Sequence, residues 1–329
     1  MSRFLGYLFA VAALGLALLF ASGFWAITQI NTPNGIETPS EFLIEPGKSG
    51  RQIADDLGQQ SLIARPDFFY VWMRLKGSTI KAGEYEIPPR ASIKKIHDIL
   101  ASGKTIQRSV TLPEGFTIRQ AMALINGAPY LTGDVTELPP EGSLLPETYS
   151  YTRGETRAAL LQRMQAAHDK LLDELWEKRD PELPLKSKDE AVTLASIVEK
   201  ETGKAEERQK IAGLFYNRLK IGMPLQTDPT VVYVITDKLG HMGGKPLLSK
   251  HLQVDSPYNT YKVVGLPPGP IANPGQASLE AVFNPEQHNY LFFVADGTGG
   301  HVFSETLSGH NKNVTEWRKI KKELNKKKP

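Results

Sequence analysis

Residues 186–202 read KSKDEAVTLASIVEKET, and this stretch predicts a helix. Ser187 is a residue type that caps helix N-termini, and Asp189 and Glu190 follow it where the positive end of the helix dipole favours acids. At about 100° per residue, the apolar side chains cluster within an arc of roughly 120°. The members of this arc are Ala191, Leu194, Ile197 and Val198. The helix is therefore expected to bury this face.

The last turn of the predicted helix carries two glutamates with different expected environments. Glu201 falls near the middle of the apolar arc, whereas Glu199 points about 140° away from Leu194. Burying a carboxyl group without a partner raises its pKa, and an acid that stays protonated near neutral pH can cleave a glycosidic bond as a general acid. Glu201 is therefore the candidate catalytic acid. In the competing interpretation it reaches solvent at a frayed helix end, or pairs with an arginine such as Arg208 or Arg218.

The chain after this helix combines a second helix with polar loops. Residues 206–221 (EERQKIAGLFYNRLKI) predict a helix with Gly222 as its C-cap. It leads into a polar turn at 224–230 (PLQTDPT), and further polar or proline-rich loops follow at 258–261 and 265–275. Amides, hydroxyls and tyrosine faces suit a sugar-binding cleft, although ordinary connecting loops have a similar composition.

Upstream, one local pattern occurs three times. An apolar strand end is followed by a proline turn, a Ser or Thr cap, and apolar residues four and eight positions after the cap. The caps are Ser49, Ser92 and Thr117. The pattern predicts three strand-turn-helix units, although three copies do not make a solenoid.

The N-terminus is strongly apolar. Residues 4–27 (FLGYLFAVAALGLALLFASGFWAI) would form a helix of roughly 36 Å, long enough to span a bilayer. Small residues at 21–23 would also suit a cleaved signal peptide, but the apolar run exceeds the usual length of about 7–15 residues, which favours an anchor. Arg3 and the amino terminus place the N-terminus in the cytoplasm. Residues 31–40 (NTPNGIETPS) have the composition of a linker.

Composition excludes several classes of protein. A length of 329 residues suggests about two domains, and the absence of cysteine excludes disulfides, cysteine nucleophiles and thiolate metal sites. The net charge of +3 (39 basic and 36 acidic residues) argues against a dedicated nucleic-acid binder. Without HExxH, Walker A, GxSxG or GxGxxG motifs, we expect no metal and no cofactor. The basic run at 318–328 is interpreted as a solvated helix end, with contact to anionic wall polymer or lipid headgroups as the alternative.

Taken together, the motifs resemble the endolytic murein transglycosylase (YceG-like) family. Six motifs stand in family order: LASIVEKET (194–202), FYNRL (215–219), LQTDPTV (225–231), YNTY (258–261), GLPPGPI (265–271) and FVADG (293–297). PETY (146–149) and GHVF (300–303) resemble an earlier and a closing element, so the resemblance covers about residues 40–320. Residues 42–57 (FLIEPGKSGRQIADDL) also resemble the opening of LysM-type modules, small folds that bind the glycan backbone of cell walls.

The resemblance implies a reaction that needs a single carboxyl group. Glu201, the second glutamate of the E-K-E-T motif, would protonate the glycosidic oxygen between N-acetylmuramic acid and N-acetylglucosamine. It would then take the proton of the muramyl C6 hydroxyl as that oxygen closes onto C1, leaving a 1,6-anhydromuramyl end. One carboxyl can serve both steps, whereas hydrolytic glycosidases use two. The expected substrate-binding residues are Gln226, Thr227, Asp228, Tyr258, Asn259, Tyr261 and Glu147.

We therefore expect an α+β protein with a single transmembrane helix. The predicted parts are a cytoplasmic N-terminus and membrane helix (1–30), a linker (31–40), a LysM-like module (41–106), a catalytic domain (107–320) and a basic tail (321–329). The resemblance implies a bacterial inner-membrane protein whose periplasmic domain cleaves peptidoglycan strands beside penicillin-binding synthases. Two alternatives remain: a muramidase-type hydrolase in which Asp228 activates water, and a noncatalytic glycan-binding scaffold.

Overall fold

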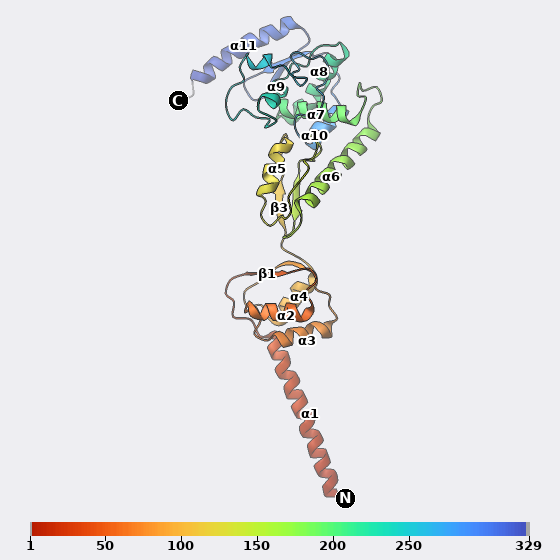
Figure 1. The fold of residues 1–329 in the computed structure, drawn as a ribbon, viewed down its shortest axis with the longest axis vertical. Coiled ribbons are helices and arrows are strands. Elements are labelled where there is room, and N and C mark those ends of the chain that lie inside the picture. Colours follow the sequence, from red (N-terminus) through yellow and green to blue (C-terminus); the bar gives the residue numbers. More distant parts are fainter. Residues whose placement is uncertain (1, 327–329) are drawn as a thin grey trace. The chain divides into compact units, whose positions relative to one another are not determined.

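The computed structural model describes residues 2–326 and contains two compact units, residues 1–108 and 109–329 (Figure 1). The sequence placed this boundary between residues 106 and 107. Helices dominate both units, and the strands form three two-stranded sheets, β1–β2, β3–β4 and β5–β6. This mixed content agrees with the predicted α+β class.

The first unit is a small module attached to a long helix. Its elements are α1 (Ser2–Asn31), β1 (Ser40–Ile44), α2 (Gly50–Gln59), α3 (Pro66–Lys76), β2 (Gly83–Ile87) and α4 (Ile93–Ser102). Strands β1 and β2 pair antiparallel with Phe42 opposite Tyr85, and both of these side chains are fully buried. The helices pack around this pair to form one apolar core.

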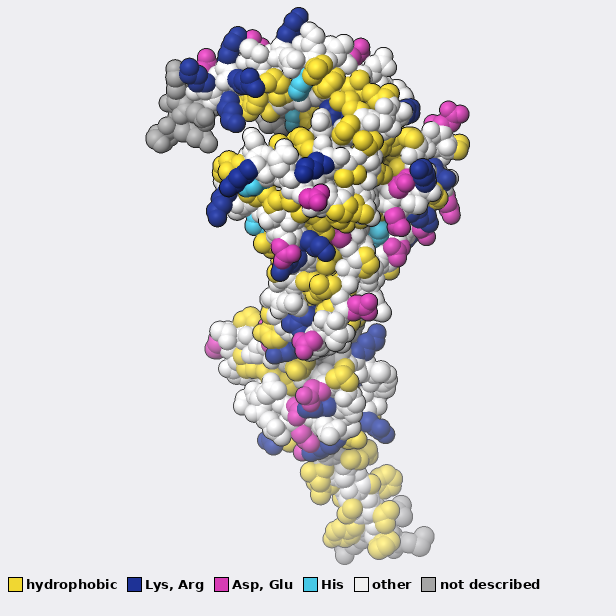
Figure 2. All heavy atoms as spheres, turned by 45° about the horizontal axis from the view of Figure 1, so that its top comes forward, with side chains coloured by type: hydrophobic (Ala, Val, Ile, Leu, Met, Phe, Trp, Pro, Cys, Tyr) yellow, Lys and Arg dark blue, Asp and Glu magenta, His cyan; other side chains and the backbone are white. Residues whose placement is uncertain are grey.

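Helix α1 is long and apolar enough to cross a membrane over Gly6–Asn31. Its described side chains are hydrophobic or uncharged, as Figure 2 shows, and most of them are exposed. At its C-terminal end, however, Ile30 is buried in the core of the module. Helix α1 therefore ends inside the first unit.

The predicted linker at residues 31–40 lies against the module. Asn34 donates from its backbone N–H to the Ala91 carbonyl at 3.0 Å and from Nδ2 to the Leu62 carbonyl at 3.0 Å. The Ile36 carbonyl accepts from the Arg90 N–H at 3.0 Å. With the bridge between Pro33 and Ser92, these contacts hold the segment on the module.

The second unit begins with a smaller subdomain. It contains β3 (Arg108–Thr111), α5 (Ile118–Gly127), β4 (Thr148–Tyr151) and α6 (Arg157–Lys178). Apolar side chains of these four elements share one core. The backbone N–H of Leu112 donates to the Glu147 carbonyl at 2.9 Å and extends the contact between β3 and β4.

The remainder of the second unit is built around helix α7. Its elements are α7 (Lys188–Glu201), η1 (Ala205–Glu207), α8 (Arg208–Lys220), α9 (Asp228–Ile235), η2 (His251–Gln253), α10 (Gln276–Phe283), β5 (Phe292–Ala295), β6 (His301–Ser304) and α11 (Leu307–Lys326). Eight consecutive residues of α7, Ala191–Val198, are buried, since α8, α9 and α10 all pack against it. The predicted burial of the apolar arc is confirmed, and the residues between its members are buried as well.

Local capping chemistry explains where several helices begin. The side chains of Ser49, Ser92 and Thr117 each accept a hydrogen bond from the backbone N–H three residues ahead, at the N-termini of α2, α4 and α5. Ser187 caps α7 in the same way. The three predicted strand-turn-helix units are confirmed, and the apolar residues four and eight positions after each cap are buried.

Two predicted boundaries differ from the structure. The polar turn predicted at 224–230 ends in a helix, because Thr227 is the N-cap of α9 and Pro229 lies in its first turn, where proline is tolerated. The predicted basic tail at 321–329 is not separate, since α11 continues to Lys326. Residues 327–329 lie outside the described residues, as does Met1 of the predicted cytoplasmic segment.

Candidate active site

Glu201 is the last residue of α7, and its side chain lines a cavity of about 380 Å³ in the second unit. The side chain is partly buried. The other lining residues are Arg218, Gln226, Asp228, Tyr261, Phe292, Phe293, Leu307 and His310. Helices α7, α8, α9 and α11, strand β5 and two loops thus line one cavity.

The surroundings of Glu201 favour its protonated form. Burial raises the pKa of Glu201 to about 8, the negative charge of Asp228 adds to this rise, and the positive charge of Arg218 opposes it. No residue in the described part of the chain forms an ion pair with Glu201 within 4.0 Å. The carboxyl group therefore faces the cavity as an acid at neutral pH, and the alternative of an arginine partner does not hold.

Arg218 supplies a fixed positive charge at the wall of this cavity. Its side chain is 5% exposed. Its Nε donates to the Leu291 carbonyl at 2.6 Å, and its Nη1 donates to the carbonyls of Leu225 at 2.7 Å and Pro224 at 3.3 Å. Backbone oxygens thus hold the guanidinium in place, so it can act on charge in the cavity without reorganising. The sequence suggested Arg218 only as a possible partner of Glu201.

Asp228 and Tyr261 face the cavity as a hydrogen-bonded pair. The Tyr261 hydroxyl donates to Asp228 Oδ1 at 2.6 Å. Asp228 is the first residue of α9, where the helix dipole stabilises a negative charge. Burial and this hydrogen bond raise the pKa of Tyr261, which therefore stays protonated. The structure thus brings together Glu201 and three of the predicted substrate-binding residues, Gln226, Asp228 and Tyr261.

Four other predicted substrate-binding residues do not line this cavity. Thr227 is buried, and its backbone N–H donates to Thr260 Oγ1 at 3.0 Å. Asn259 is fully buried and donates from Nδ2 to the carbonyls of Leu252 and Val254. Both therefore organise the loops that carry cavity residues. The other two are Tyr258, whose ring centroid lies 5.3 Å from that of Tyr233, and Glu147, which is exposed beside β4.

Glu199 has a different role from Glu201. Its side chain is 6% exposed, and its Oε2 accepts a hydrogen bond at 3.0 Å from the backbone N–H of Gly275, the N-cap of α10. Arg208 lies 3.9 Å from Glu199 and 3.3 Å from Glu114. The first glutamate of the E-K-E-T motif is thus engaged in packing α10, while the second faces the cavity.

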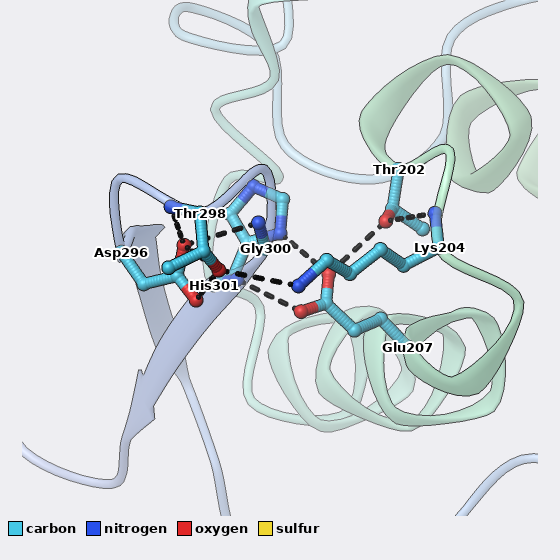
Figure 3. Close-up of polar contacts among 7 residues, drawn as sticks. All are labelled: Thr202, Lys204, Glu207, Asp296, Thr298, Gly300 and His301. Atoms are coloured by element: carbon cyan, nitrogen blue, oxygen red, sulfur yellow. Dashed lines mark hydrogen bonds and ion pairs between the residues drawn. The ribbon is translucent and has the colours of Figure 1, made fainter.

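A polar network joins the end of α7 to the β5–β6 hairpin (Figure 3). Glu207 Oε1 accepts from the His301 backbone N–H at 2.8 Å, and Glu207 Oε2 contacts His301 Nδ1 at 2.8 Å and accepts from Thr202 Oγ1 at 3.0 Å. Thr202 directly follows Glu201 and is the C-cap of α7. The ring of His301 also packs against Phe293, which lines the cavity. Glu207 therefore connects the backbone at the candidate acid to one wall of its cavity.

The C-terminal helix also contributes to the cavity. Leu307 and His310 lie in the first turn of α11, and the His310 ring stacks on Phe292 with centroids 5.4 Å apart. Burial and the nearby charge of Arg218 lower the pKa of His310, so its imidazole is neutral at pH 7. The sequence analysis missed these residues, because a lone histidine about 110 positions after Glu201 carries no local signal. Among residues 2–326, no group of three or more metal-ligating side chains occurs.

The sequence model of the YceG-like family matches residues 42–316, which cover most of both compact units and all the residues of the cavity. The chain belongs to the YceG-like family. The match begins after α1, so the apolar helix lies outside the part shared with the family model.

Relatives of this YceG-like chain carry an enzyme name. It is 33% identical over 308 residues to the endolytic murein transglycosylase of Bacillus subtilis (strain 168), covering 84% of each chain. It is 30% identical over 325 residues to the endolytic murein transglycosylase of Streptococcus pneumoniae serotype 2 (strain D39), covering 83% of this chain and 57% of that protein. A crystal structure of a YceG-like protein from Listeria monocytogenes is similar with a TM-score of 0.52 and 31% identity, over 84% of this chain and 99% of that one.

Proposed function

We propose that this YceG-like chain is an endo-acting lytic transglycosylase of peptidoglycan in which Glu201 is the general acid and base. The observation that carries the proposal is a carboxyl group with a pKa raised to about 8 that faces an open cavity without an ion-pair partner. Relatives that share most of this chain are named endolytic murein transglycosylases.

The proposed reaction uses Glu201 twice. The protonated carboxyl gives its proton to the glycosidic oxygen between N-acetylmuramic acid and N-acetylglucosamine, and the bond from that oxygen to the muramyl C1 breaks. The carboxylate then takes the proton of the muramyl C6 hydroxyl while that oxygen bonds to C1. Glu201 is protonated again, and no water is consumed. The products are a 1,6-anhydromuramyl end and a new N-acetylglucosamine 4-hydroxyl end.

The other charged groups have complementary roles in this proposal. The carboxylate of Asp228 adds to the effect of burial in keeping Glu201 protonated before the reaction, and it stabilises positive charge that develops at C1. Arg218 limits how far the pKa of Glu201 rises, so that the same group can act as a base in the second step. Gln226 and Tyr261 would contact the sugar hydroxyls at the cavity wall.

The location of the enzyme is part of the same proposal. We infer that α1 anchors the chain in the bacterial inner membrane, with its N-terminus in the cytoplasm and the chain after α1 outside. The first unit would act as a LysM-like glycan-binding module, since the resembling residues 42–57 form strand β1, a turn and helix α2. An enzyme held at the membrane would meet nascent strands beside the penicillin-binding synthases.

Product chemistry tests the function directly. Full-length protein in detergent is incubated with purified peptidoglycan, and the fragments are analysed by mass spectrometry beside a Glu201→Gln variant. A matched control is Glu206→Gln, which changes an exposed acid five residues away. We expect anhydromuramyl ends, one water lighter than reducing ends, from the wild type and the control only.

Other products would favour the alternatives. Reducing ends would indicate hydrolysis, with Asp228 as the group that activates water. Retained glycan binding without any cleavage by the wild type would indicate a noncatalytic scaffold.

A further inference from the structure

Helix α3 of the first unit has apolar side chains on two sides. Phe69 and Met73 are buried in the core of the module. Four other apolar side chains follow one another at intervals of three, one and three residues, which places them on one stripe of a helix. This outer stripe consists of Phe68, Val71, Trp72 and Leu75, of which Phe68 and Trp72 are half-buried and also pack against the core of the module. Val71 is 52% exposed and Leu75 is 76% exposed, so nothing in the described chain covers the end of the stripe.

The outer stripe is continuous with the apolar surface of α1. The rings of Trp25 in α1 and Phe68 in α3 meet edge to face with centroids 5.4 Å apart. From Phe4 to Trp25 the helix rises roughly 33 Å, which is close to the hydrocarbon thickness of a bilayer. Trp25 would therefore lie at the membrane–water interface, where tryptophan is enriched, and it would hold Phe68 at the same depth.

The charges around the stripe suit a lipid surface. Arg65 precedes α3, and Arg74 and Lys76 lie in its last turn; all three are exposed. Asp67, the acidic residue of this helix, pairs with Arg51 at 2.7 Å. Exposed apolar side chains such as Val71 and Leu75, flanked by exposed basic residues, are the composition of a helix that lies in a membrane interface beside anionic headgroups.

We propose that α3 is an interfacial helix that lays its outer stripe on the outer face of the bilayer next to α1. This inference rests on the proposed membrane anchor. Since Ile30 and Asn34 tie the end of α1 to the module, a second contact through α3 fixes the tilt of the module relative to the membrane. A single span alone would let the module rotate and tilt.

Depth-dependent fluorescence quenching in the full-length protein tests the proposal. The chain has no cysteine, so single cysteines can be labelled with an environment-sensitive dye without a background. The test position is Leu75→Cys, which alters an exposed side chain outside the core. The matched control is Glu86→Cys, an exposed position on β2, the strand that pairs with β1. Figure 1 shows β1 at the side of the module away from α1. The protein is reconstituted in vesicles of phosphatidylethanolamine and phosphatidylglycerol that contain lipids spin-labelled at a shallow or a deep position.

We expect shallow spin labels to quench the dye at Leu75→Cys and to leave the dye at Glu86→Cys unchanged. A third position, Leu14→Cys, reports on the anchor and should be quenched by the deep label. Quenching at Leu14→Cys without quenching at Leu75→Cys would overturn the interfacial helix while leaving the anchor intact. Absence of quenching at both positions would overturn the anchor as well.

Two further measurements, quenching by aqueous iodide and a change of lipid headgroup, show whether lipid or protein contacts the outer stripe. A dye at Leu75→Cys that is shielded from aqueous iodide but not quenched by lipid spin labels would mean that protein covers the stripe, which contradicts the proposal. Replacing phosphatidylglycerol with phosphatidylcholine should reduce quenching at Leu75→Cys, because the basic residues lose their anionic partners. Unchanged quenching would overturn the role of these residues.

Discussion

The Tyr261 hydroxyl donates a hydrogen bond to Asp228 Oδ1 at 2.6 Å in the cavity that Glu201 lines. Tyr261 is held in its protonated form by burial and by this contact. The hydrogen bond stabilises the carboxylate of Asp228, and that negative charge in turn raises the pKa of Glu201. The pair therefore adds to the effect of burial, which is the main cause of the raised pKa of Glu201.

Activity is expected to fall as the pH rises through the pKa of Glu201. The first step requires the protonated carboxyl of Glu201, whose pKa is raised to about 8. In a pH profile, kcat/KM should therefore fall as the pH rises past about 8. In Asp228→Asn, the loss of a negative charge lowers the pKa of Glu201, and this fall should move to lower pH. Asp255→Asn, an exposed acid outside the cavity, is the control. If kcat/KM fell at the same alkaline pH in wild type and Asp228→Asn, Glu201 would not be the group whose ionisation limits the activity.

Glu201→Gln should abolish cleavage and stabilise the fold at alkaline pH. General acid catalysis contributes about 10²–10⁴-fold, so a loss of at least this order is expected in kcat. The folded-state pKa of Glu201 is raised above its ordinary value of 4.5, so ionisation of this group destabilises the native state as the pH rises between 4.5 and about 8. The amide variant lacks this effect. Its Tm should exceed that of the wild type at pH 8 and match it at pH 4, which thermal unfolding can measure.

Breaking the contact between Glu207 and His301 should reduce both stability and activity. Burial raises the pKa of Glu207, but the hydrogen bonds from His301 and Thr202 outweigh it and hold the pKa below its usual range. Glu207→Ala leaves buried donors without an acceptor, which costs about 1–3 kcal/mol. Without the contact to Glu207, the β5–β6 hairpin would also shift, and Phe293 would move away from the cavity wall. We expect a lower kcat, with partial rescue in Glu207→Gln.

The control for this variant is the neighbouring exposed acid. Glu206→Ala should retain the wild-type Tm and kcat, since its side chain lies in solvent. Because the pKa of Glu207 is depressed, its stabilising effect is present above pH 4.5 and is lost as the pH falls through its folded pKa. A Glu207→Ala variant with unchanged kcat would restrict the network to a structural role.

Gly213 is expected to tolerate no side chain. A Cβ atom there would lie 2.3 Å from the Glu286 backbone oxygen and 3.0 Å from His288 Nε2. The segment that contains Glu286 is held against α8, because its Glu286 N–H donates a hydrogen bond to the Gln209 carbonyl. It therefore cannot move aside. Gly213→Ala should destabilise the protein by about 1–3 kcal/mol, although alanine favours helices by up to about 1 kcal/mol. Gly127→Ala, which meets nothing within 4 Å, should be neutral or stabilising in denaturant unfolding.

Local interactions made much of the secondary structure predictable. The caps at Ser49, Ser92, Thr117 and Ser187 bind backbone groups three residues away, so the sequence alone contains both partners. The apolar spacing after each cap likewise identified buried side chains. Glu201 was found because its position continues an apolar arc within one helix.

Only the tertiary structure decided which polar residues face the cavity. Thr227 and Asn259 stand beside Asp228 and Tyr261 in the sequence, yet they turn inward and bond to loop backbone. A short polar side chain can satisfy either a backbone group or a ligand, and composition does not distinguish the two. Arg218 and His310 reach Glu201 through packing of segments that lie 17 and 109 residues away in the chain. Motif and local spacing therefore identified Glu201 as the candidate acid, while long-range packing decided its burial and its neighbours.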